Sequence, residues 1–144
     1  MSKIIYTQSN GTVAVIHPVG GDASKAIKDV PDGVAYEIVE DSAIPTDRSF
    51  RSAWVQDNKT IKIDMSKAKD EHRKNIRRAR TFKFPDLDAE YNKLSETSAD
   101  TSAVVAKKQT LRDAPADSAI EAASDEAELK AQWNTSILGT SPYS

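Results

Sequence analysis

TIKIDMSKAKDEHRKNIRRAR, residues 60–80, contains the change of pattern that decides the fold of this chain. Its first residues alternate apolar and polar side chains, which is typical of a β-strand because neighbouring side chains point to opposite faces. From Asp64 onward the apolar positions recur at helical spacing, and Asp64 itself is a suitable N-cap. The pattern therefore predicts a β-rich part before residue 64 and a helical part after it.

The residues before this change predict a small, mostly antiparallel sheet. KIIYTQSNGTVAVIHPV at 3–19 consists of two β-rich runs around an Asn-Gly pair, which favours a two-residue type I′ hairpin because both positions need positive φ. VAYEIVE at 34–40 and TIKIDM at 60–65 add further strands, and residues 22–29 can form a short helix. We expect three or four strands within residues 1–63 and the α+β fold class for the whole chain.

IPTDRSFRSAW at 44–54 lies between the last two of these strands. Pro45 favours extended geometry at the residue before it, and Thr46 or Asp47 can cap a short helix that begins near Arg48. Phe50 and Trp54 are four residues apart, on one face of such a helix. They form either a ligand platform with the two arginines or a structural corner. We expect the corner, which would hold the sheet against the long helix, because aromatics at helical spacing usually belong to the core.

Residues 64–133 predict a helical hairpin followed by short helices. The helical spacing continues up to a polar break, SETSADTS at 95–102, and resumes beyond it, as two antiparallel helices around a loop would require. Ser118 and Asp125 each begin a spacing similar to a capping box, which predicts one or two short helices. Residues 134–144 are small and polar without periodicity, so we expect an extended or flexible tail.

Charge is distributed unevenly along the chain. The net charge is −2, yet residues 64–83 carry 8 basic and 3 acidic side chains, whereas residues 84–144 carry 5 and 11. Clustered lysines and arginines are typical of a phosphate-binding surface. Arg73, Arg77 and Arg80, however, are spaced by four and three and form one ridge suited to carboxylates of a partner protein or of this chain's own tail. We expect protein contact or a solvated face, with nucleic-acid binding as the alternative.

The composition argues against catalysis and against bound metals. The chain has no cysteine, which excludes disulfides and thiolate zinc sites, and its two histidines do not suffice for an imidazole metal site. There is no glycine-rich phosphate loop followed by Lys-Ser/Thr, and adjacent carboxylates occur only where a helix would leave them solvated. We expect no enzymatic activity, no metal and no cofactor.

The chain also lacks the sequence features of a membrane protein. The N-terminal segment contains no uninterrupted apolar stretch typical of a signal peptide. No window approaches the roughly 20 apolar residues that span a bilayer. We therefore expect a soluble protein that is made in a cytoplasm and does not bind membranes.

Four segments resemble, in the same order, small proteins encoded in the tail modules of bacteriophages and prophages. They are MSKIIYTQSNGTVAVIHP (1–18), VPDGVAYEIVEDSAIPTDRSFRSAWV (30–55), IKIDMSKAKDEHRKNIRRAR (61–80) and KKQTLRDAPADSAIEAASDEAELKAQW (107–133). The LRDAP within the last segment is similar to the tail assembly chaperone and tail-fibre assembly group, in which a helical hairpin ends in a Leu-Arg-Asp-x-Pro turn.

The resemblance implies a non-enzymatic adaptor or assembly factor that binds phage tail or tail-fibre proteins in the host cytoplasm. A structural subunit of the virion, forming a homo-oligomer around a symmetric tail, is the alternative within the same class. The docking surface that we expect for the partner consists of the arginine ridge and residues beyond it: Arg73, Arg77, Arg80, Leu111, Arg112 and Trp133.

Overall fold

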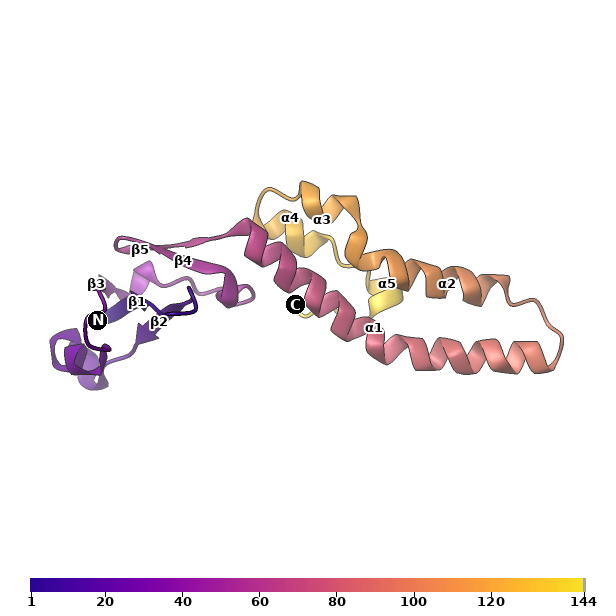
Figure 1. Cartoon of the computed structure of the whole chain (residues 1–144), viewed down its shortest axis with the longest axis horizontal. Coiled ribbons are helices and arrows are strands. Elements are labelled where there is room, and N and C mark those ends of the chain that lie inside the picture. The colour runs from indigo at the N-terminus through magenta and orange to yellow at the C-terminus, as the bar shows by residue number, and fades with distance from the viewer. Residues whose placement is uncertain (144) are drawn as a thin grey trace. The chain divides into compact units, whose positions relative to one another are not determined.

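The structure, a computed structural model, describes residues 1–143, which divide into two compact units. The first unit comprises residues 1–68 and contains two antiparallel sheets, whereas the second, from residue 69 onward, is helical (Figure 1). The predicted α+β fold class is confirmed.

A three-stranded antiparallel sheet in the order β2-β1-β3 forms the centre of the first unit. β1 (Ser2–Thr7) pairs with β2 (Val13–Ile16) on one side and with β3 (Tyr36–Glu40) on the other. The predicted hairpin between β1 and β2 is present, but its connection is longer than the expected two-residue turn. The Gln8 amide donates to the Thr12 carbonyl at 2.8 Å, and Gly11 within the loop has φ 84°.

The central strand β1 is buried on both faces. Ile4 packs against Ala23 and Ala26 of a 3-10 helix, η2 (Ala23–Asp29), which replaces the short helix expected at 22–29. Ile5 on the opposite face packs with Trp54 and the neighbouring strands. Both isoleucines are 0% exposed, so a strand with adjacent apolar side chains fits here because the sheet is covered on each side.

The structural corner differs from the expected helix. Only one 3-10 turn forms, η4 (Arg51–Ala53), and Trp54 is the first residue of a strand, β4 (Trp54–Asp57), which pairs with β5 (Thr60–Ile63). The helical interpretation of this spacing was wrong, because a turn followed by a strand can also bury two aromatics four residues apart. The turn of this second hairpin contains Asn58 at φ 53°, which asparagine tolerates better than most residues.

Phe50 and Trp54 are buried nonetheless, at 0% and 1% exposure. Trp54 belongs to the cluster on the Ile5 side of the sheet, and its indole N–H has no hydrogen-bond partner among residues 1–143. Asp47 accepts a hydrogen bond from the Ser49 amide at 3.0 Å, and Pro45 is half-buried. The corner residues thus serve packing and turn formation.

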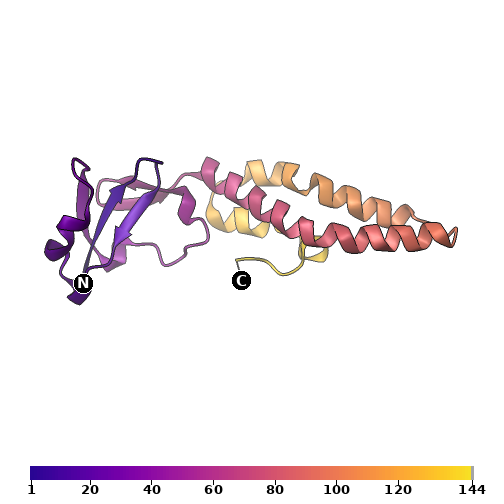
Figure 2. The same ribbon diagram turned by 60° about the horizontal axis from the view of Figure 1, so that its bottom comes forward.

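The second unit is built on two long helices that lie side by side and antiparallel (Figures 1 and 2). α1 (Met65–Glu96) continues through Pro85 and ends before a short loop, and α2 (Ser102–Asp113) returns along it. Lys108 of α2 forms an ion pair with Asp88 of α1 at 2.6 Å. The predicted helical hairpin is therefore present, with its loop inside the polar break.

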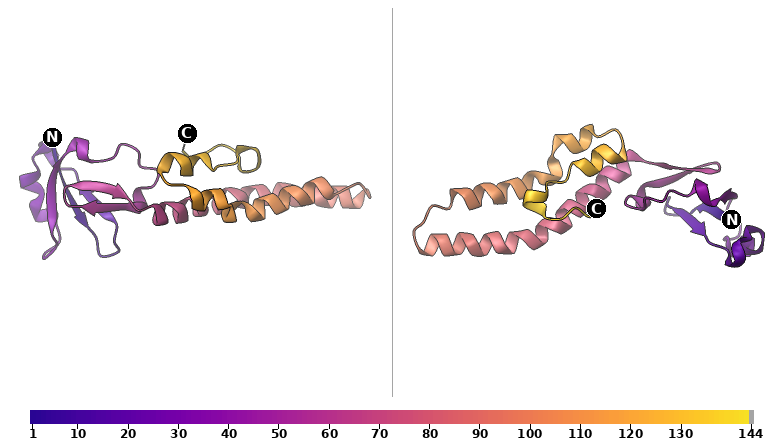
Figure 3. Two further views of the ribbon diagram at one scale, coloured as in Figure 1. Left: turned by 90° about the horizontal axis from the view of Figure 1, so that it is seen from above. Right: turned by 180° about the vertical axis from the view of Figure 1, so that it is seen from behind.

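Short helices follow α2: η5 (Ala114–Ala116), α3 (Ser118–Ala122), α4 (Glu126–Ala131) and α5 (Thr135–Leu138). Asp117 caps α3, one residue before the expected start, and Asp125 caps α4 as its spacing predicts. The predicted extended tail was wrong for part of its length, since residues 135–138 are helical and the chain after α4 returns alongside α1 (Figure 3). Residue 144 lies outside the described residues.

Candidate protein-docking cleft

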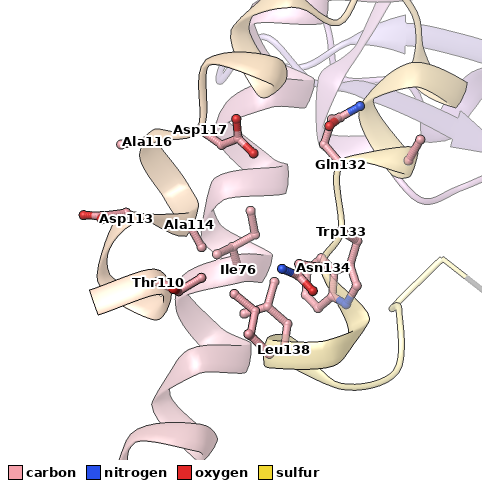
Figure 4. Close-up of a pocket in the computed structure, with 12 residues that line it drawn as sticks. Ile76, Thr110, Asp113, Ala114, Ala116, Asp117, Gln132, Trp133, Asn134 and Leu138 are labelled. Carbon is pink, nitrogen blue, oxygen red and sulfur yellow. The ribbon is translucent and has the colours of Figure 1, made fainter. Parts of the chain in front are cut away.

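A cleft of about 600 Å³ lies in the second unit, between the α2–η5 turn on one side and the α4–α5 segment on the other (Figure 4). Its floor is apolar because Ile76, Trp133 and Leu138 are buried there. Polar side chains, among them Thr110, Asp117 and Asn134, lie along its margin. The full lining comprises Ile76, Thr110, Asp113, Ala114, Ala116, Asp117, Ala131, Gln132, Trp133, Asn134, Ile137 and Leu138.

Asp113 and Ala114 of the LRDAP turn, residues 111–115, line one wall of this cleft, and two arginines of α1 hold the turn in place. The Arg80 guanidinium donates to the carbonyls of Leu111 and Arg112 at 3.2 and 3.0 Å. Arg73 donates to the Pro115 carbonyl at 3.3 Å. The last carbonyls of a helix have no partner within it and carry partial negative charge, so a guanidinium satisfies and neutralises them.

Arg73 also connects α1 to α3. Its guanidinium donates to the Glu121 carboxylate at 2.7 Å, and Lys69 donates to the Glu121 backbone carbonyl at the same distance. The hydrogen bond from Arg73, followed by the attraction of Lys69, lowers the pKa of Glu121 below its ordinary value. These cations therefore bind groups of their own unit.

The expected docking residues separate into two groups. Leu111 and Trp133, at 1% and 9% exposure, are core residues, so their side chains are not accessible to a partner. Arg73 and Arg80 bind α3 and the end of α2, so of the two expected partners, a second protein or this chain's own tail, these two arginines take the tail. The remaining members, Arg77 and Arg112, are exposed.

The opposite wall is organised around Trp133. Its indole N–H donates to the Gly139 carbonyl at 3.0 Å, which returns the chain after α5 towards the tryptophan. The Asn134 side chain caps α5 through the Ser136 amide at 3.1 Å. These two hydrogen bonds hold both ends of α5 to the segment that follows α4.

His72 packs behind Trp133 and is completely buried. Its Nε2 lies 3.0 Å from the Gln132 carbonyl, which only accepts, so Nε2 carries the proton and Nδ1 accepts from the Tyr143 hydroxyl at 2.6 Å. Burial lowers the pKa of His72, and the hydrogen bond to Gln132 opposes this effect without reversing it. Asn75 donates to the same hydroxyl at 3.3 Å. The imidazole is thus a neutral, satisfied core group.

The lining of the cleft provides a hydroxyl, carboxylates and amides around an apolar floor. Residues 1–143 contain no group of three or more histidine, aspartate or glutamate side chains arranged to hold a metal ion. Sequence reasoning missed Asp117, Asn134 and Tyr143. The two caps have a recognisable local signal, whereas nothing in the tail sequence predicted the contact of Tyr143 with His72.

Comparison with known proteins identified no relative of this chain. No protein-family model matches the chain, no curated protein matches it, and no solved structure matches it. Within residues 1–143, no helix combines the length and apolar character needed to cross a bilayer.

Proposed function

We propose that this protein is a non-enzymatic adaptor or assembly factor that binds tail or tail-fibre subunits of a bacteriophage. The single observation that carries the proposal is the cleft beside the LRDAP turn, 111–115. This turn resembles the tail assembly group, and its Asp113 and Ala114 line one wall of the cleft. Arg73 and Arg80 hold the same turn through its backbone carbonyls. A partly apolar depression next to such a motif is suited to docking.

The size and lining of the cleft favour an anchoring side chain of a partner protein. Pockets of about 300–1,000 Å³ receive small molecules or the anchor residues of an interface, which insert into well-packed apolar pockets. Ala116, Ala131 and Ile137 provide the accessible apolar surface above the buried floor. Asp117 and Asn134 provide hydrogen-bonding groups. An aliphatic or aromatic anchor flanked by a basic or polar residue is the chemistry that fits.

The proposal excludes a covalent step because the cleft presents no activated nucleophile. The Thr110 hydroxyl in the lining donates to the Ala106 carbonyl, and the histidine behind the floor is occupied at both ring nitrogens. A serine or threonine nucleophile needs an adjacent base that can take its proton. Binding is therefore the role that the lining supports best.

Two measurements test the proposal, one on purified phage particles and one on infected cells. Quantitative mass spectrometry of purified particles determines whether the protein is retained, and capture of the tagged protein from infected cells identifies its partner. We expect capture of a tail or fibre subunit with little protein in the finished particle. Stoichiometric amounts in the particle would instead establish the alternative of a structural virion subunit, and capture of neither tail nor fibre proteins would contradict both.

A further inference from the structure

We propose that the solvent-facing side of α1 pairs with α1 of a second copy of this chain, in antiparallel orientation, to form a two-fold dimer. This inference concerns a different surface from the cleft and does not depend on the proposed function. The outer face of α1 is defined as the exposed side chains that lie opposite the buried Ile76 and next to one another along the helix: Lys74, Arg78, Phe82, Pro85, Ala89, Asn92 and Glu96.

The middle of the outer face is apolar although it is exposed to solvent. Phe82 is 73% exposed, whereas Tyr91, which lies towards α2, is 37% exposed. Pro85 and Ala89 follow Phe82 at helical spacing and are both exposed. A large exposed ring beside small side chains is the arrangement that lets two helices approach closely, with the ring of one covering the small residues of the other.

The charges along the outer face favour a second copy of this chain as the partner and determine its orientation. On the outer face the basic side chains, Lys74 and Arg78, precede Pro85, and the acidic side chain, Glu96, follows it. An antiparallel pair places the basic end of each outer face against Glu96 of the other copy, which is favourable on both sides of the two-fold axis. A parallel pair would place like charges together and be repelled.

The register follows from the position of the small residues. A two-fold axis at Pro85 places Lys74 opposite Glu96 and Arg78 opposite Asn92, and brings Phe82 next to Ala89 of the other copy. Lys74 and Glu96 then each lie about 16 Å from the axis along the helix, at about 1.5 Å rise per residue. The charged pairs flank a central apolar contact, which is the usual anatomy of a specific interface.

Disulfide trapping tests this arrangement directly because the chain has no cysteine. We expect an equimolar mixture of Lys74→Cys and Glu96→Cys to form a covalent dimer under mild oxidation. Each variant alone should not, since in an antiparallel pair two copies of one position are separated by about 33 Å, at about 1.5 Å per residue. Ala103→Cys, on the exposed side of α2, is the control for random collision.

Cross-linking of each variant with itself would indicate parallel pairing and overturn the proposal. Cross-linking of the mixture no faster than the Ala103→Cys control would overturn it as well. Circular dichroism spectra of all three variants establish that the cysteines leave the helices intact.

Sedimentation equilibrium provides an independent measurement. We expect Phe82→Ser to raise the dimer dissociation constant at least about tenfold, as loss of a central anchor does. Glu96→Lys should weaken the dimer, and the double variant Lys74→Glu with Glu96→Lys should restore it. Failure of the double variant to restore association, or a monomeric wild-type chain at all concentrations up to about 1 mM, the limit of weak affinity, would contradict the proposal.

Discussion

His72 is the residue whose burial has the clearest consequence for stability. Its ring is hydrogen-bonded at both nitrogens in the neutral form, and burial lowers its pKa below the ordinary 6.5. The unfolded chain therefore binds a proton more readily than the folded chain. The stabilisation is complete above pH 6.5 and is lost as the pH falls from 6.5 through the lower pKa of the folded state.

We predict that the free energy of unfolding falls between pH 8 and pH 5, and that His72→Phe flattens this dependence. Urea unfolding at several pH values measures the slope. Carboxylates such as Glu121, whose pKa is lowered, titrate at lower pH. They are present in both the wild type and the His72→Phe variant, so they do not account for a difference between the two slopes. An identical slope for wild type and His72→Phe would show that His72 is not responsible.

Trp54 is the largest fully buried side chain and packs with Ile5, Val13 and Val39. We predict that Trp54→Ala destabilises the first unit by about 3–5 kcal/mol, because it removes a large apolar group and leaves a cavity. Trp54→Phe should cost less than half as much, since it keeps most of the ring and removes the unpaired indole N–H. Thermal or urea unfolding measures both changes.

Val19→Ala, at a position 97% exposed, is the control and should change stability by less than about 0.5 kcal/mol. A Trp54→Ala protein as stable as this control would show that the tryptophan is not part of the core. Loss of partner binding by such a stable variant would instead assign residues 44–54 to the contact surface.

At the scale of elements, the end of α2 depends on a side chain from α1. Arg80 donates to the carbonyls of Leu111 and Arg112. We predict that Arg80→Gln lowers the free energy of unfolding of the second unit by about 1–3 kcal/mol, in the range of hydrogen bonds to charged groups. Arg77→Gln on the same helix, where the side chain is exposed, should change it by less than about 0.5 kcal/mol. Equal effects of the two substitutions on urea unfolding would contradict the capping role.

The cleft can be tested through α4, which contributes Ala131 to its lining. We predict that Ala131→Trp fills part of the cleft and weakens capture of the tail or fibre partner at least about tenfold, as obstruction of an anchor pocket does. Ala127→Trp is the matched control, because Ala127 is exposed on the same helix and does not line the cleft. Equal capture by both variants in a pull-down assay would place the docking surface elsewhere.

At the scale of the whole molecule, charge bears on the nucleic-acid alternative. The chain has a net charge of −2, and Lys69, Arg73 and Arg80 of its basic segment bind groups of their own unit. We predict no measurable affinity for a random DNA duplex at low salt. If binding occurs, its log–log dependence on salt should have a slope of about −0.9 per phosphate contacted. A slope steeper than about −4 in a fluorescence anisotropy titration would restore the alternative, because several phosphates would then be neutralised.

Local sequence patterns determined the order and type of most elements. Alternation at 60–65 and helical spacing beyond Asp64 placed the change from strand to helix, and the Asn-Gly pair placed the first hairpin. Caps were equally readable, because Asp125 hydrogen-bonds an amide only three residues away. These features depend on contacts between near neighbours, so the sequence contains them directly.

Tertiary structure decided which side of each element is covered, and this is where the expectations for the site failed. The spacing of Arg73 and Arg80 showed a shared helix face, yet only the return of α2 and α3 brought the carbonyls and the carboxylate that these arginines bind. Trp54 begins a strand and packs on the Ile5 side of the sheet. The Tyr143 hydroxyl is hydrogen-bonded to His72, which lies 71 residues away in sequence. The periodicity of a sequence shows which side chains share one face of a helix or strand. Whether that face is buried depends on the segment that packs against it, and that segment is distant in sequence.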